Sequence, residues 1–128
     1  MSYDIHFERN GERIHLDNPH SLKGGTYALG GTTEAWINIT YNYDPWFYEA
    51  FGKDGIRSLY GKPANEVAER IKETLPKVIA SSLPERPCSC HNSLECYWAS
   101  IPGNAAEALR SLRELALMCP PDSICNGD

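Results

Sequence analysis

Polar and apolar residues alternate at the start of the chain, over Asp4 to Glu8 and again over Arg13 to Asp17. Strict alternation is typical of a strand with one buried face. Asn10-Gly11 separates the two runs and is the strongest short signal for a hairpin turn. The pattern therefore predicts an N-terminal β-hairpin.

A two-residue loop also fixes which residues of this hairpin face each other. Phe7 would lie opposite Ile14 and His6 opposite His15, which puts the large apolar side chains on one face. Two opposed imidazoles could share an ion or a phosphate, and a plain solvated polar face is the alternative. The same register gives two further pairs, Ile5 with Leu16 and Asp4 with Asp17.

A second strand region follows a stretch rich in glycine. Glu34 to Tyr41 has strong strand propensity, with Ile37 and Ile39 on one face. Gly24-Gly25 and Gly30-Gly31 bracket a short predicted strand. No helix follows these glycines directly, so we interpret them as tight turns rather than as a phosphate-binding loop.

Apolar residues recur at helical spacing in the second half of the chain. They predict one helix from Ala64 to about Ser82, bent near Pro76, and another from Asn104 to about Met118. Asp44-Pro45 predicts a shorter helix that ends near Gly52. Strands followed by helices indicate an α+β fold: an N-terminal antiparallel sheet, built from the hairpin and one or two further strands, with two main helices packed on it. We expect a single domain over residues 1–128.

Charge narrows the classes of partner. The 128 residues carry a formal net charge of −5, and the basic residues are scattered rather than gathered on a stripe. A protein that binds duplex nucleic acid without sequence preference normally has a basic face, so we exclude that class. The chain shows neither an apolar leader nor a segment of membrane-spanning length, and we expect it in the cytoplasm.

Four stretches carry a resemblance to a known type of sequence. They are GGTYALGGTTEAWINITYNY (24–43), GIRSLYGK (55–62), GNAAEALRSL (103–112) and the terminal PDSICNGD. Together they resemble a small uncharacterised domain family found in bacteriophage and prophage genomes, over most of the chain. The resemblance implies a phage accessory protein in a host cell, of the kind that often inhibits host defence systems, but it assigns no chemistry to any residue.

A cluster of metal-binding residue types lies where the chain departs from that family pattern. Cys88, Cys90, His91 and Cys96 fall within nine residues. Thiolates and imidazole suit Zn²⁺. Their spacing lacks the paired C-x2-C knuckles of familiar zinc sites. We therefore expect no metal or other cofactor, and a zinc site at these four residues is the alternative.

Aromatic residues are concentrated around the second strand region, and they suggest a binding surface. Trp36, Asn38 and Thr40 share one predicted strand face, where an ordinary solvated strand would carry Lys or Glu. We predict that this face binds a ligand or partner, together with Tyr27 and with Arg57 as its charge complement.

The sequence therefore predicts a binding protein more readily than an enzyme, because no catalytic arrangement stands out. We expect a host protein or a small anionic ligand, such as a signal nucleotide, as the partner, and self-association of the chain is a further alternative. The competing hypothesis is a small metal-dependent enzyme or zinc-stabilised module built on the Cys88–Cys96 cluster.

Overall fold

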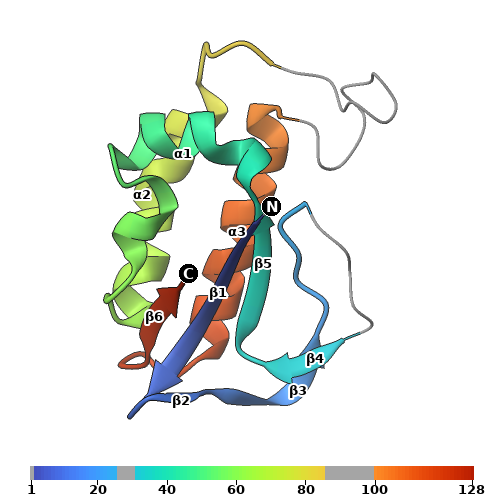
Figure 1. Cartoon of the computed structure of the whole chain (residues 1–128), viewed down its shortest axis with the longest axis vertical. Coiled ribbons are helices and arrows are strands. Elements are labelled where there is room, and N and C mark those ends of the chain that lie inside the picture. The colour runs from blue at the N-terminus through green and yellow to red at the C-terminus, as the bar shows by residue number, and fades with distance from the viewer. Residues whose placement is uncertain (1, 26–30, 86–99) are drawn as a thin grey trace.

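The computed structural model describes residues 2–25, 31–85 and 100–128, and it confirms the α+β fold (Figure 1). The main sheet contains β1 (Ser2–Arg9), β2 (Glu12–Arg13), β5 (Trp36–Thr40) and β6 (Ile124–Gly127), and β3 (His15–His20) pairs with β4 (Thr32–Glu34). The helices are α1 (Asp44–Phe51), α2 (Ala64–Ile79) and α3 (Pro102–Met118), with 3-10 turns at Tyr41–Tyr43 and Gly55–Leu59.

The predicted hairpin turn is present. Asn10 and Gly11 have φ values of 55° and 79°, the left-handed conformation that a two-residue hairpin loop needs at both positions. The register beside the turn is the predicted one, with Arg9 opposite Glu12 and Glu8 opposite Arg13.

Beyond the turn, the predicted register holds only as far as Phe7. The Ile14 amide donates to the Phe7 carbonyl at 2.8 Å, but the Phe7 amide donates to the Ala35 carbonyl at 3.0 Å. From this point β1 pairs with β5, so the predicted pairs His6–His15, Ile5–Leu16 and Asp4–Asp17 are wrong. The observed partners on β5 are Trp36 for His6, Ile37 for Ile5 and Asn38 for Asp4.

Burial explains why β5 replaces the second arm of the hairpin. Ile37 and Ile39 of β5 are both fully buried, whereas Leu16 of β3 is only partly buried. Pairing β1 with β5 therefore removes more apolar surface from water than a longer hairpin would. The segment β3 turns away instead and pairs with β4.

The other edge of β1 pairs with β6, a strand that the sequence analysis did not predict. Ile5 lies opposite Gly127 and Phe7 opposite Cys125. The outer edge of β6 is covered in turn, because the Cys125 amide donates to the Lys62 carbonyl at 2.9 Å. The first and last strands of the described chain are thus neighbours (Figure 1).

The two long helices occur close to where the apolar spacing predicted them. α2 continues through Pro76 as one helix and ends at Ile79, three residues before the predicted end. Val78 continues its buried stripe, while Ile79 is 56% exposed. α3 begins two residues earlier than predicted. Within the described ranges, no helix is both long enough and apolar enough to cross a membrane.

All three helices pack on the same face of the sheet. The buried side chains of β1 and β5 come from alternate positions and share one core with residues of the three helices. Figure 1 shows α3 behind β1 and β5. The opposite face of these strands is covered by no helix of the described chain.

Candidate functional site

The sheet face that the helices leave uncovered carries polar side chains from four strands. We call it the open face. Because successive side chains of a strand alternate between faces, the residues between the core positions point to this side. Its members are Asp4, His6 and Glu8 on β1, Arg13 on β2, Trp36 and Asn38 on β5, and Asn126 on β6.

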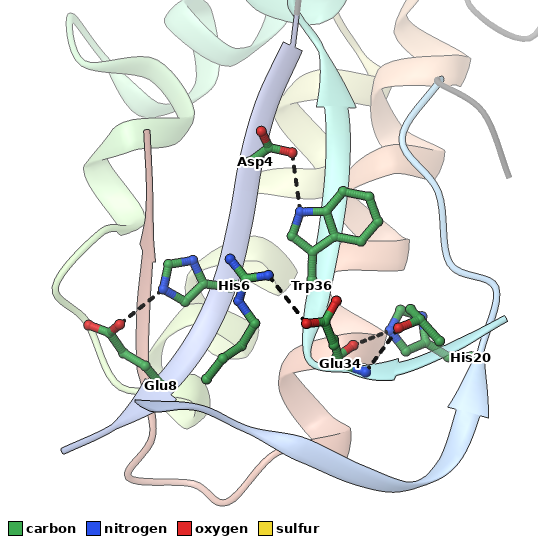
Figure 2. Close-up of polar contacts among 8 residues, drawn as sticks. Asp4, His6, Glu8, His20, Glu34 and Trp36 are labelled. Carbon is green, nitrogen blue, oxygen red and sulfur yellow. Dashed lines mark hydrogen bonds and ion pairs between the residues drawn. The ribbon is translucent and has the colours of Figure 1, made fainter. Parts of the chain in front are cut away.

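Asp4 is the centre of the first cluster on the open face (Figure 2). Its Oδ1 atom accepts a hydrogen bond from the Trp36 indole Nε1 at 3.1 Å and another from the Asn38 Nδ2 at 2.9 Å. The Asn38 amide also donates to the Tyr3 carbonyl at 3.2 Å. The carboxylate thus holds the indole by its N–H edge. Asp4 is exposed, and Trp36 and Asn38 are half-buried.

Glu8 is the centre of the second cluster. Its Oε2 atom lies 3.0 Å from the His6 Nε2, and its Oε1 accepts from the Asn126 Nδ2 at 3.2 Å. The hydrogen bond from His6, followed by the one from Asn126, holds the pKa of Glu8 below its ordinary value. Both oxygens of this carboxylate are therefore engaged within the fold.

Next to the open face, the pair of strands β3 and β4 is held in place by His20. The His20 ring is buried, and its Nδ1 accepts from the Leu22 amide at 3.2 Å. The ring proton therefore lies on Nε2, which donates to the Glu34 carbonyl at 2.7 Å. The Glu34 side chain lies 3.7 Å from Arg13 (Figure 2). This corner anchors the residues that lead into Trp36.

The structure brings together two of the five residues predicted to form a binding surface. Trp36 and Asn38 meet at Asp4. Thr40 is buried, and its Oγ1 accepts from the Asn42 amide, so it caps the 3-10 turn after β5 instead of facing a ligand. Tyr27 lies outside the described residues.

Arg57, the fifth predicted residue, lies away from the open face. Its guanidinium carbon is 4.8 Å from the centre of the Tyr3 ring, and Tyr3 points from β1 toward the core side. The Arg57 Nε donates to the backbone oxygen of Asp128 at 2.9 Å. Tyr3 itself donates to Asp44 at 2.6 Å, and burial together with this bond raises the pKa of Tyr3. Arg57 thus lies over the Tyr3 ring and does not supply a positive charge beside Trp36.

Asp4 is the site residue that sequence reasoning missed. The predicted hairpin register put it opposite Asp17. Its true neighbours became evident only once β1 paired with β5. Both arms of the hairpin and the strand after the glycines alternate in the same way, so alternation alone does not select β5 as the partner.

The metal hypotheses find no supporting group in the described chain. His6 pairs with Trp36 and His15 with Glu34, so the two imidazoles are not opposite each other. Over residues 2–25, 31–85 and 100–128, no group of three or more His, Cys, Asp or Glu residues is placed to hold a metal ion. The cluster of Cys88, Cys90, His91 and Cys96 lies outside those residues.

The two cysteines of the described chain are part of the core. Cys119 and Cys125 are free thiols, and both are buried. Burial raises the pKa of Cys119 to about 11 and that of Cys125 to about 12. Thiols that stay protonated at neutral pH are poor nucleophiles and poor metal ligands.

A groove of about 790 Å³ lies between the hairpin and the end of α3. It is lined by side chains of both charges, including Arg13, His15 and Asp17. Arg9, another residue that lines the groove, is already paired with Asp122. The mixed charges of the groove favour no single class of ligand.

Comparison of the chain with protein-family models, with curated proteins and with solved structures finds no match. The functional interpretation therefore depends on the residues of the open face themselves.

Proposed function

We propose that this protein is a non-enzymatic binding protein that contacts a partner protein through the open face. The observation that supports this most directly is the Asp4 carboxylate, which accepts hydrogen bonds from both Trp36 and Asn38. A half-buried indole held by its N–H edge loses little freedom when a partner covers it. Tryptophan is also among the residues that contribute most to binding at protein interfaces.

The charges of this face favour a protein over a nucleotide. Asp4 and Glu8 are acidic, Arg13 opposite Glu8 lies 3.7 Å from the Glu34 carboxylate, and Arg57, the predicted charge complement, lies elsewhere. A phosphate placed beside Trp36 would meet the Asp4 carboxylate and be repelled. A protein surface can instead present basic and apolar groups together. Such a binding role needs no cofactor.

The biological setting of the proposal comes from the sequence resemblance. A small phage or prophage accessory protein acts in the cytoplasm of its bacterial host. We therefore propose a host protein as the partner, with inhibition of a host defence system as the consequence of binding.

Capture of the partner with matched variants tests the proposed function. The immobilised protein is incubated with host lysate, and retained proteins are identified by mass spectrometry. Trp36→Ala should lose the retained partner while keeping a cooperative unfolding transition, at a cost of about 1–2 kcal/mol in stability. Tyr48→Ala, which removes an aromatic side chain that is 45% exposed on α1, should retain the partner.

Two results would contradict the proposal. Equal capture by wild type and Trp36→Ala would show that the open face is not the binding surface. Concentration-dependent dimerisation that Trp36→Ala abolishes, measured by light scattering, would assign the face to a second copy of the chain instead.

A further inference from the structure

Among the described residues, one carboxylate of the open face has no arginine or lysine beside it. Glu8 lies opposite Arg13 in the sheet and 3.0 Å from the His6 ring, and the Arg13 guanidinium also lies 3.7 Å from Glu34, next to this face. Asp4, by contrast, receives hydrogen bonds only from neutral donors within the described chain: the Trp36 indole and the Asn38 amide through Oδ1, and its other oxygen, Oδ2, accepts none. An unneutralised negative charge therefore lies at the centre of the face.

That charge lies beside an aromatic ring. The distance of 3.1 Å from Trp36 Nε1 to Asp4 Oδ1 places the carboxylate at the N–H edge of the indole (Figure 2). The face of an aromatic ring attracts cations, and tryptophan does so most strongly. A planar cation that lies on the ring and extends past this edge would reach the carboxylate. Ring and carboxylate thus present two attractive groups to one positive charge.

An aromatic ring next to a carboxylate favours an arginine side chain over a lysine side chain. A guanidinium is planar, stacks on aromatic rings and donates several hydrogen bonds in one plane. An ammonium is compact and strongly hydrated, and it gains less from stacking. The chain as a whole has a formal net charge of −5, which favours the approach of a basic surface.

We propose that an arginine side chain of the partner protein lies on the Trp36 indole and pairs with the Asp4 carboxylate. This inference rests on the proposed function, because it names the group that the open face recognises. Asp4 supplies the charge, Asn38 helps to hold the carboxylate, and Trp36 supplies the stacking surface.

The variants for the test remove the charge of Asp4 without disturbing the fold. Asp4→Asn removes the negative charge but keeps an oxygen that can accept from the indole. Because Asp4 is exposed, this change should leave the fold intact. Glu73→Gln removes the same charge from an exposed position on α2 and serves as the control. Trp36→Phe keeps an aromatic face, whereas Trp36→Ala removes it.

A peptide titration provides the direct test. The probe is a short glycine peptide with one arginine and blocked ends, and the control peptide carries citrulline, its uncharged analogue. The Trp36 indole N–H signal, assigned with Trp36→Phe, is followed by NMR at millimolar peptide concentrations. We expect a saturable shift with the arginine peptide and at least a several-fold weaker one with the citrulline peptide. Asp4→Asn should remove the difference between the two peptides, and Glu73→Gln should preserve it.

Other results would overturn the inference. An equal response to both peptides, or no saturable response to the arginine peptide, would show that the site does not recognise a guanidinium. A shift of the same signal on concentrating the protein alone would assign the face to a second copy of the chain.

Partner capture then distinguishes failure of this inference from failure of the proposed function. If the captured partner is lost with Trp36→Ala but retained by Asp4→Asn, the face binds the partner without a charge pair, and only the arginine proposal fails. If both variants retain the partner, the proposed function fails as well.

Discussion

Asp4 and Glu8 lie on the same face of β1, yet the structure gives the two carboxylates different roles. Glu8 has both oxygens engaged by His6 and Asn126. Asp4 fixes an indole through one oxygen and keeps the other for solvent or a partner. The alternation of β1 in the sequence predicts that both residues are on the polar face. It could not distinguish them, because Trp36 and Asn38 beside Asp4 and Asn126 beside Glu8 come from strands far away in the chain.

The lowered pKa of Glu8 predicts a dependence of stability on pH. A carboxyl group whose pKa is lower in the folded than in the unfolded chain stabilises the fold above its unfolded pKa, and this contribution is lost as the pH falls through the lower, folded value. The window therefore lies below the ordinary value of 4.5. Urea unfolding between pH 7 and pH 3 should show a smaller loss of stability for Glu8→Gln than for wild type. Parallel curves for the two proteins would contradict this assignment.

Among the elements, those set by local patterns were predicted well and those set by distant pairing were not. The helical apolar spacing located α2 and α3 to within a few residues, and Asn10-Gly11 located the turn. The strand β6 was missed because four residues, of which only Cys125 is fully buried, make a weak local pattern. The register from Phe7 onward was wrong because two strands competed for the same edge of β1.

The segment at Gly24 also has a role that its local pattern did not predict. The sequence indicated a tight turn, but Gly24 lies against β5 and extends the sheet. Its amide donates to the Asn38 carbonyl at 3.1 Å, and its carbonyl accepts from the Thr40 amide at 2.9 Å. A Cβ atom on Gly24 would lie 2.5 Å from the Ile39 Cγ1 and 2.9 Å from its Cα. Glycine is therefore required here by close packing.

A matched pair of glycine substitutions tests this explanation. Gly24→Ala should lower the free energy of unfolding by about 1–3 kcal/mol, because the backbone of β5 must shift to admit the methyl group. Gly103→Ala, in the first turn of α3 where nothing lies within 4 Å of a Cβ, should raise it by about 0.5 kcal/mol. Chemical denaturation of both variants measures the two changes. A neutral Gly24→Ala would show that the segment does not pack closely on β5.

At the scale of the whole molecule, the open face depends on a sheet in which the last strand, β6, pairs with the first, β1. β1 lies between β5 and β6, and it contributes Asp4, His6 and Glu8 to the face and Tyr3, Ile5 and Phe7 to the core. A partner bound at Trp36, as proposed, would therefore contact strands that are fixed by both halves of the chain. This arrangement also explains why no local stretch of sequence could define the site.

The position of β6 predicts that a chain ending at Ser123 will not reach the native fold. The loss of β6 removes the buried Cys125 side chain and the hydrogen bonds of this strand to β1, Gly61 and Lys62. At about 1 kcal/mol for each hydrogen bond, the cost is on the order of 5 kcal/mol, which equals the total stability of many small domains. The shortened chain should lose its near-ultraviolet circular dichroism and its sharp urea transition.

A chain that ends at Gly127 is the control for this truncation. It lacks only Asp128, whose contacts are one hydrogen bond from the Asp4 amide at 2.9 Å and one from Arg57 at 2.9 Å, both exposed. Its urea midpoint should stay close to that of the full chain, because exposed hydrogen bonds are readily replaced by water. If the chain ending at Ser123 instead unfolds sharply at the wild-type midpoint, β6 is not part of the cooperative unit, and the open face must be held by β1 and β5 alone.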